Sequence, residues 1–282
     1  MSLKNCTIFL VGNNEKGKVM NDLSDVTAVI LAGGLGTRLR EETEFRPKPM
    51  VEVGGKPIIW HIMKNMSEQG VKRFVICTGY KGYAIKNYFL NYDAQQSDLH
   101  LTLGSAKQNF YTEIRDRVEW EVSIVDTGLA TPTGGRLNRI KHLISSPTFL
   151  CTYGDGLADI DLLELYNYHR NGSAIATVTS VQPYSRFGVM DIAENGIVKN
   201  FREKPKVDGW VNAGFFMLNK TFFDYLTDTS ILEDDPLNEL VLEKNLRAYK
   251  HHGFWQPMDT YRESQMLNQM WESDNAPWKN WE

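Results

Sequence analysis

The sequence has few cysteines and no strong excess of either charge. Its 282 residues include three cysteines, Cys6, Cys77 and Cys151, which lie far apart and form no CxxC pair. The sequence therefore predicts neither a disulfide framework nor a zinc site, and it favours a reducing, cytoplasmic location. The formal net charge of -4 excludes the broad basic surface that a nucleic-acid partner requires. The expected partners are small molecules.

Long hydrophobic runs are also missing. No apolar segment approaches the roughly 20 residues that cross a bilayer, so no membrane partner is expected. The short apolar segment 6–11 is not followed by the small-residue cleavage pattern of a signal peptide. Internal repeats and low-complexity linkers are absent as well. The sequence predicts an N-terminal extension, residues 1–25, followed by one domain, residues 26–282.

The most informative stretch is AVILAGGLGTRL, residues 28–39. A short apolar run, typical of a buried strand, ends in a glycine-rich turn that is followed by Thr37 and Arg38. Glycines allow backbone N–H groups to approach an anion closely, and an arginine adds a fixed positive charge. A plain strand-to-helix turn is the alternative. We interpret the stretch as a phosphate-binding loop.

Strand and helix patterns alternate after this loop, which indicates parallel strands in an open α/β sheet. Ligands of such sheets bind at the carboxyl ends of the strands. From residue 174 the pattern becomes mainly strands, with a hairpin over 188–192 and 197–201 joined by Glu-Asn-Gly. Other expected strands are 74–78, 122–125, 148–153 and 210–218. One expected helix begins at Pro57, and the others span 84–92, 137–143, 162–169, 236–244 and 260–272.

Two basic side chains occupy suggestive positions. Lys48 stands between Pro47 and Pro49, which restrict the local backbone and aim the side chain. Arg136 ends a second glycine-rich loop, residues 126–136, immediately before an expected helix. The N-terminus of a helix favours the binding of an anion. The alternatives are a surface lysine and a surface helix-entry turn.

Asp155 and Asp259 are the candidate carboxylates. Asp155 lies between two glycines after an expected strand, as either a turn former or a ligand of a hard cation. Asp259 precedes Thr260 and is either a helix cap or a second ligand of the same cation. Asp159 and Asp161 are expected to be caps of the next helix. The adjacent histidines 251 and 252 would point to opposite faces of a strand, which argues against a shared metal.

Taken together, the motifs resemble those of sugar-1-phosphate nucleotidyltransferases. LAGGLGTRL, RPKPMVEVGGKPI, TYGDG, FREKP, VNAGFF and GFWQPMDT occur in the family's order, over residues 27–282. The resemblance implies a Rossmann-like, open, mostly parallel mixed sheet flanked by helices, with a β-rich sugar-binding part. Residues 26–173 would mainly bind nucleotide and 174–260 sugar phosphate, and 261–282 would form a C-terminal helix and tail.

The resemblance also implies a reaction, in which CTP and α-D-glucose 1-phosphate give CDP-glucose and pyrophosphate with the help of Mg²⁺. This step leads toward dideoxy sugars of bacterial surface polysaccharide. Members of the family form homo-oligomers, here expected as a trimer or hexamer, with sites near subunit interfaces. Arg136 is accordingly expected to act across such an interface.

The resemblance assigns roles residue by residue. Arg38, Lys48 and Asp155 would be catalytic, and Asp155 and Asp259 would bind the metal. The nucleotide would contact Leu31, Ala32, Gly33, Gly34, Gly36, Thr37, Arg38, Lys48, Thr127, Gly128, Thr133, Gly134 and Arg136. The sugar phosphate would contact Tyr153, Gly154, Glu203, Lys204, Asn212 and Gly214. In VNAGFF the family commonly has glycine where this chain has Ala213.

Two other classes of protein match the motifs less well. In a dinucleotide-binding oxidoreductase, Gly34 and Gly36 would begin GxGxxG, but Leu39 replaces the third glycine. Glu52, at the distance of a ribose-binding acid, lies in a proline-rich loop rather than at a strand end. A non-catalytic nucleotide sensor would have no need for both Asp155 and Asp259.

Overall fold

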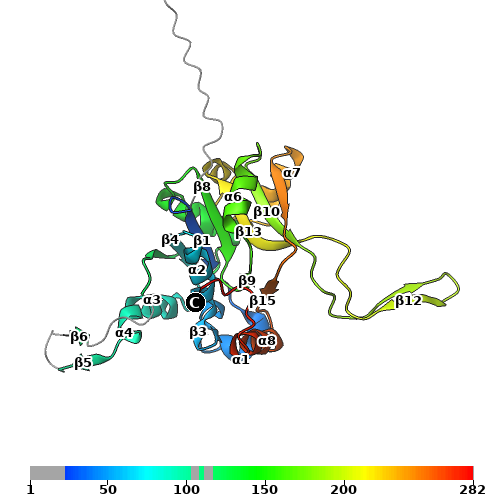
Figure 1. The fold of residues 1–282 in the computed structure, drawn as a ribbon. Coiled ribbons are helices and arrows are strands. Elements are labelled where there is room, and N and C mark those ends of the chain that lie inside the picture. The colour runs from blue at the N-terminus through cyan, green and yellow to red at the C-terminus, as the bar shows by residue number, and fades with distance from the viewer. Residues whose placement is uncertain (1–22, 103–107, 111–116, 282) are drawn as a thin grey trace, which may run out of the picture.

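The computed structural model describes residues 23–102, 108–110 and 117–281. Its centre is a seven-stranded sheet with the strand order β14-β10-β13-β8-β1-β4-β7 (Figure 1). All neighbouring strands are parallel except β13, which is antiparallel to both β8 and β10. The mostly parallel mixed sheet predicted from the sequence is confirmed. Its strands are β1 (Thr27–Ala32), β4 (Arg73–Thr78), β7 (Glu121–Asp126), β8 (Thr148–Tyr153), β10 (Ala176–Val181), β13 (Val211–Asn219) and β14 (Leu246–Lys250).

Two hydrophobic cores cover the two faces of this sheet. Successive residues of β1 alternate between them, with Ala28 and Ile30 in one core and Val29 and Leu31 in the other. Both cores bury apolar residues of the flanking helices, so the strands are apolar on both sides. The helices are α1 (Arg40–Thr43), α2 (Ile58–Glu68), α3 (Gly82–Leu90), α4 (Tyr92–Gln95), α5 (Thr133–Ile140), α6 (Leu162–Arg170), α7 (Asp235–Leu242) and α8 (Tyr261–Glu272), with 3-10 turns η1 (Thr37–Leu39), η2 (Lys48–Met50), η3 (Lys141–Leu143) and η4 (Lys220–Tyr225).

Four two-stranded pairs complete the described structure. β9 (Gly156–Ala158) pairs with β15 (Trp255–Pro257), and β11 (Val189–Ile192) pairs with β12 (Val198–Arg202). The second pair is the hairpin predicted from the sequence, and it extends far from the body (Figure 1). We call it the arm. The other pairs are β2 (Glu52–Val53) with β3 (Lys56–Pro57) and β5 (Leu99–Leu101) with β6 (Gln108–Phe110).

Several predicted boundaries were wrong. Helix α5 begins at Thr133 rather than at Leu137, so Gly134, Gly135 and Arg136 belong to its first two turns. The sequence suggested a loop because glycine disfavours helix. Here both glycines are required, since a Cβ on either would come within 2.8 Å of a backbone oxygen of residue 228 or 230.

Helix α2 begins at Ile58, with Pro57 as the preceding N-cap residue. Of the two aspartates expected to cap α6, only Asp161 does so, by accepting a hydrogen bond from the Glu164 N–H at 2.7 Å. Asp159 instead accepts from the Phe254 N–H at 2.7 Å and pairs with His251 at 2.8 Å. Asp159 therefore anchors the loop before β15 rather than the helix.

The predicted N-terminal extension lies outside the described residues up to position 22. The last part of it, from residue 23, joins the core, because Leu23 is fully buried. Across the described ranges, no helix combines the length and the apolar character needed to span a membrane.

The C-terminal tail docks onto α2 around a buried histidine. Trp278 is fully buried, and its carbonyl accepts a hydrogen bond from the Asn65 side chain at 2.7 Å. His61 Nε2 lies 2.7 Å from the Val53 carbonyl, so Nε2 carries the proton. The bare Nδ1 then accepts from the Trp278 indole N–H at 3.4 Å. Burial lowers the pKa of His61 to about 4, so this histidine is neutral in the folded protein.

This neutral histidine predicts a loss of stability in mild acid. The unfolded chain takes up a proton at residue 61 near pH 6.5, whereas the folded chain does so only near pH 4. Stability is therefore lost as the pH falls through this window, by about 2 kcal/mol from this group at pH 5. Urea unfolding at pH 7 and pH 5 measures the loss. His61→Gln should lower stability at pH 7 yet reduce the pH dependence, and an unchanged pH dependence in that variant would contradict the assignment.

Candidate functional site

The largest group of predicted site residues meets in one cavity at the carboxyl ends of β1 and β8. The cavity has a volume of about 420 Å³. The loop after β1 and the segment that enters α5 both line it. Its lining comprises Leu31, Ala32, Gly33, Gly34, Gly36, Thr37, Lys48, Pro49, Thr131, Pro132, Thr133, Arg136, Tyr153, Gly154, Asp155 and Asp259. We call it the loop cavity.

A second cavity, of about 270 Å³, adjoins the first. It includes Asn212 and Gly214 from β13, which were predicted to bind a sugar phosphate, together with Trp255 and Pro257 from β15. Three residues line both cavities, namely Tyr153, Asp155 and Asp259. We call it the β13 cavity. Two ligands placed in these cavities would meet at the two carboxylates.

Tyr153 stands on the border between the cavities. Its hydroxyl donates to Glu233, a residue of the segment before α7. Burial and this carboxylate raise the pKa of Tyr153 well above its usual value, so the phenol stays neutral. A Cβ on Gly214 would lie 2.4 Å from the Tyr153 ring, and Gly214 also has a φ of +80°. Glycine is therefore needed beside this tyrosine.

The glycines of the loop after β1 serve three different purposes. Gly36 has a φ of +64°, a conformation that favours glycine. Gly33 is required for another reason, because a Cβ there would lie 2.0 Å from the Arg136 guanidinium. A Cβ on Gly34 would meet no atom within 4 Å, so its backbone faces open space at the cavity. Only Gly36 shows the unusual backbone that the sequence suggested for the adjacent glycines.

The Arg136 side chain is held inside its own chain. It is 5% exposed, and its Nη1 donates to Thr127 Oγ1 and to the carbonyls of Thr78 and Gly128 at 2.8 to 3.0 Å. Its Nη2 donates to the Gly33 carbonyl at 3.1 Å. Burial lowers the pKa of Arg136, although arginine stays charged. The predicted action across a subunit interface was therefore wrong, because these bonds direct the guanidinium inward.

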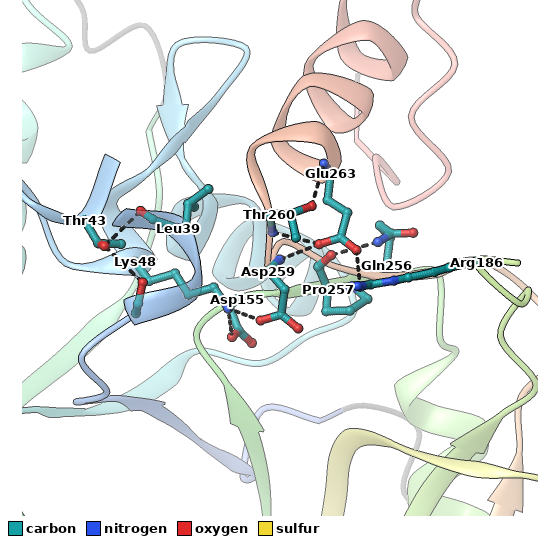
Figure 2. A network of polar contacts seen from close by, with 11 residues as sticks. Leu39, Thr43, Lys48, Asp155, Arg186, Gln256, Pro257, Asp259, Thr260 and Glu263 are labelled. Carbon is teal, nitrogen blue, oxygen red and sulfur yellow. Dashed lines mark hydrogen bonds and ion pairs between the residues drawn. The ribbon is translucent and has the colours of Figure 1, made fainter. Parts of the chain in front are cut away.

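Lys48 joins the two candidate carboxylates (Figure 2). Its Nζ lies 2.6 Å from Asp155 Oδ2 and 2.6 Å from Asp259 Oδ1. Burial works against the charged lysine, but the two carboxylates outweigh it and raise the pKa of Lys48 above its usual value. The ammonium is therefore firmly protonated. A surface lysine, the alternative from the sequence, is excluded by a side-chain exposure of 12%.

The start of α8 positions Asp259. Thr260, rather than Asp259, is the N-cap, and it forms a capping box with Glu263. Glu263 Oε2 accepts from the backbone N–H groups of Asp259 and Thr260, both at 2.8 Å (Figure 2). Its Oε1 accepts from Arg186, at the base of the arm, at 2.7 Å. Asp259 is thus placed by the helix terminus, and its carboxylate is left to face Lys48.

Some predicted site residues do not line either cavity. Thr127, Gly128 and Gly134 lie behind the loop cavity, where the first two accept hydrogen bonds from Arg136. Glu203 and Lys204 are more than half exposed and 3.7 Å apart at the base of the arm. Lys204 lines a separate groove, which borders the β13 cavity at Trp255 and Pro257. The Arg38 side chain lies outside the described residues, so its phosphate contact stays a prediction.

Three residues of the site were not predicted from the sequence. Glu263 was recognisable in principle, because Thr-x-x-Glu before a helix is the capping-box pattern. Trp255 occurs in the quoted GFWQPMDT motif, but nothing in the sequence indicated that it lines the β13 cavity. Glu233 carries no sequence signal, since its contact with Tyr153 joins residues 80 positions apart.

The donor set fits a magnesium ion. Asp155 and Asp259 each place an oxygen 2.6 Å from the Lys48 nitrogen, so the two carboxylates converge on one point. Magnesium in proteins is usually held by one or two carboxylates together with substrate phosphates. The described residues contain no cluster of three or more His, Cys, Asp or Glu side chains that could hold a metal ion.

Comparison with known proteins agrees with this geometry. Residues 27–261 match the family described as nucleotidyl transferase. The chain therefore belongs to the nucleotidyl transferase family. Within it, the chain is 49% identical over 259 residues to glucose-1-phosphate cytidylyltransferase of Salmonella typhi. The aligned region covers 90% of this chain and 99% of that protein. It is 42% identical over 256 residues to the probable glucose-1-phosphate cytidylyltransferase of Bacillus subtilis, with the same coverage of both chains.

Solved structures show the same fold at lower identity. Apo UDP-glucose pyrophosphorylase superposes with a TM-score of 0.65 at 19% identity, over 88% of this chain and 98% of that one. HddC from Yersinia pseudotuberculosis superposes with a TM-score of 0.62 at 23% identity, over 87% of this chain and 99% of that one. These likenesses establish the architecture of the sheet and its flanking helices.

The capping box predicts that Glu263 acts on nucleotidyl transfer through Asp259. Glu263→Ala should cost about 1 kcal/mol of stability, as the loss of a helix cap does. It should also slow turnover by at least about tenfold, because Asp259 loses the acceptor that orients its backbone. Thermal unfolding and pyrophosphate release measure the two effects. Glu239→Ala, which removes an exposed glutamate of α7, is the control, and a normal turnover in Glu263→Ala would contradict the positioning role.

Proposed function

We propose that this protein is a glucose-1-phosphate cytidylyltransferase, which converts CTP and α-D-glucose 1-phosphate to CDP-glucose and pyrophosphate. The observation that carries the proposal is the pair of adjoining cavities that share Asp155 and Asp259. The identity of 49% to the Salmonella typhi protein of that name, over nearly its whole length, supports the choice of substrates.

In the proposed reaction, a phosphate oxygen of glucose 1-phosphate attacks the α-phosphorus of CTP in line, and pyrophosphate leaves. The attacking oxygen is already ionised near neutral pH, so no general base is required. The protein has to position two anions and stabilise the charge between them. We assign the triphosphate to the loop cavity, where Gly34 and Gly36 present backbone, and the sugar phosphate to the β13 cavity beside Asn212.

We also propose that Asp155 and Asp259 hold Mg²⁺ during the reaction. When bound, the ion supplies positive charge that offsets repulsion between the two phosphates. Lys48 contributes a further positive charge at the junction of the cavities, and Arg38 is proposed to contact the triphosphate. Glu203 and Lys204 are proposed to reach the sugar phosphate from the base of the arm. Residues 26–173 thus serve mainly the nucleotide and 174–260 mainly the sugar phosphate.

Three further expectations belong to this proposal, namely a cytoplasmic site of action, a role in bacterial surface-polysaccharide synthesis and a homo-oligomer, a trimer or hexamer. Cys77 and Cys151 are both free and buried, which suits a reducing compartment.

The arm supports association with a second copy of this chain. Met190, Ile192, Val198 and Phe201 are 48 to 58% exposed and form an apolar face in which Met190 pairs with Phe201 and Ile192 with Val198. An isolated two-stranded hairpin is marginally stable in water, so this face needs a partner.

The arm gives a prediction about assembly. Ile192→Glu with Phe201→Glu should convert the oligomer to monomer, because two charges would be buried in the contact between copies. Analytical ultracentrifugation measures the change. Asn200→Glu places a charge beside Asp191, away from the apolar face, and should leave the oligomer intact. A wild-type protein that sediments as a monomer at micromolar concentration would refute the proposed assembly.

The proposed function is tested by pyrophosphate release. We expect CTP to be the preferred substrate when CTP, UTP, dTTP and ATP are each supplied with glucose 1-phosphate and Mg²⁺. Asp155→Asn should reduce turnover by at least about a hundredfold without loss of cooperative thermal unfolding, because it removes one charged ligand of the site. The exposed Asp191→Asn serves as the matched control.

Each outcome bears on a different part of the proposal. A preference for UTP or dTTP would overturn the cytidylyl assignment and leave the cavities and carboxylates in their roles. Full activity of Asp155→Asn would remove the metal assignment. No pyrophosphate release with any of the four nucleotides would favour a nucleotide-binding protein without catalysis.

A further inference from the structure

The ammonium of Lys48 stands where a cation shared by Asp155 and Asp259 would have to bind. It contacts one oxygen of each carboxylate at 2.6 Å and is 12% exposed, while the carboxylates are 31% and 25% exposed. A magnesium ion sits about 2.1 Å from its oxygen ligands. An ion that bridged these same two oxygens would lie close to the lysine nitrogen and be repelled by its charge. The lysine and the metal therefore compete for this position.

The backbone of Lys48 is fixed, so only its side chain can vacate the position. Lys48 begins the 3-10 turn η2 between Pro47, whose φ is -68°, and Pro49, which is buried. Prolines on both sides leave the main chain little freedom. The four-carbon stem of the lysine, in contrast, has several rotatable bonds.

The stem of Lys48 also lies directly beside the loop that lines the proposed triphosphate site. A Cβ built on Gly36 would come within 3.3 Å of the Lys48 Cβ. Gly36, Thr37 and Lys48 line the same cavity as the two carboxylates. A phosphate group bound to this loop would therefore give the Lys48 ammonium an anionic partner close to the two carboxylates that it now contacts.

We propose that Lys48 closes the metal site of the nucleotide-free protein and that the nucleotide triphosphate opens it. The triphosphate draws the ammonium from the carboxylates, and Asp155 and Asp259 then face phosphate without the lysine between them. Two carboxylates beside an anion favour a divalent cation. Metal thus enters with the nucleotide or after it. This inference rests on the proposed Mg²⁺-dependent transfer.

The proposal predicts coupling between the two ligands. A bound metal must displace the lysine in the nucleotide-free protein, and this cost disappears once phosphate holds the lysine. Coupling free energies of this kind usually correspond to affinity changes of about 5- to 150-fold, and they are reciprocal. The site would thereby bind metal more weakly until a nucleotide is present.

The test is a Mn²⁺ titration of the nucleotide-free protein, with free Mn²⁺ measured by electron paramagnetic resonance. We expect Lys48→Met to bind one Mn²⁺ at least about tenfold more tightly than wild type. The gain should vanish in Lys48→Met combined with Asp155→Asn, which would locate the metal at the carboxylate pair. Lys64→Met is the matched control, since Lys64 is 14% exposed and pairs with Glu68 at 2.9 Å away from the site. It should bind as wild type does.

A second measurement does not depend on Mn²⁺. Millimolar Mg²⁺ without nucleotide should raise the melting temperature of Lys48→Met and leave that of wild type unchanged, because a ligand stabilises only the protein that binds it. Lys48→Gln, which keeps a polar side chain, should repeat the result if the methionine variant fails to unfold cooperatively.

The outcomes separate this inference from the proposed function. A wild-type protein that releases pyrophosphate with CTP and Mg²⁺, yet binds Mn²⁺ without nucleotide as tightly as Lys48→Met, overturns the lysine closure and leaves the function standing. No Mn²⁺ binding to Lys48→Met at any concentration tested overturns the closure too. A wild-type protein that releases no pyrophosphate is a separate outcome, because it refutes the proposed nucleotidyl transfer itself.

Discussion

One buried guanidinium ties together the loops from which the site is built. Arg136 donates to the backbone carbonyl of Thr78, the last residue of β4, and to those of Gly33 and Gly128, just after β1 and β7. These loops follow neighbouring parallel strands, so their ends meet at one edge of the sheet. A buried charged group that donates to several carbonyls holds its partners in place, because movement would leave a carbonyl or a charge unpaired. Gly33 has no side chain because this guanidinium occupies the space.

The balance of charge at Asp155 and Asp259 is the second constraint. The two carboxylates come from the ends of β8 and β15, 104 residues apart in sequence, and like charges this close require a positive partner. Lys48 supplies that partner, and the capping box of α8 sets the backbone of Asp259. The same pair is neutralised here by a side chain of the protein, and in the proposed reaction by a cation that arrives with phosphate.

The fold could be predicted from the sequence where the local sequence pattern and the tertiary structure agree. The strand 148–153 matches β8 because an apolar, β-rich run ends in a glycine turn, and the Glu-Asn-Gly signal located the arm. The start of α5 was misplaced because Gly134 and Gly135 weaken a helix in isolation. Their fit against residues 228 and 230 is a long-range contact, which no local pattern reports. Within the site, Asp155, Asp259 and Lys48 were singled out, but their mutual contact was not.

The sequence by itself determined the alternation of strands and helices, the loop after β1, and the chemical types available to bind phosphate and metal. These follow from periodicity, glycine conformation and side-chain chemistry, all of which act over a few residues. Only the tertiary structure decided that Lys48 stands between the carboxylates, that Arg136 faces inward, and that Glu233 holds Tyr153. Each of these depends on contacts between segments far apart in the chain, and such contacts exist only once the sheet has brought the strand ends together.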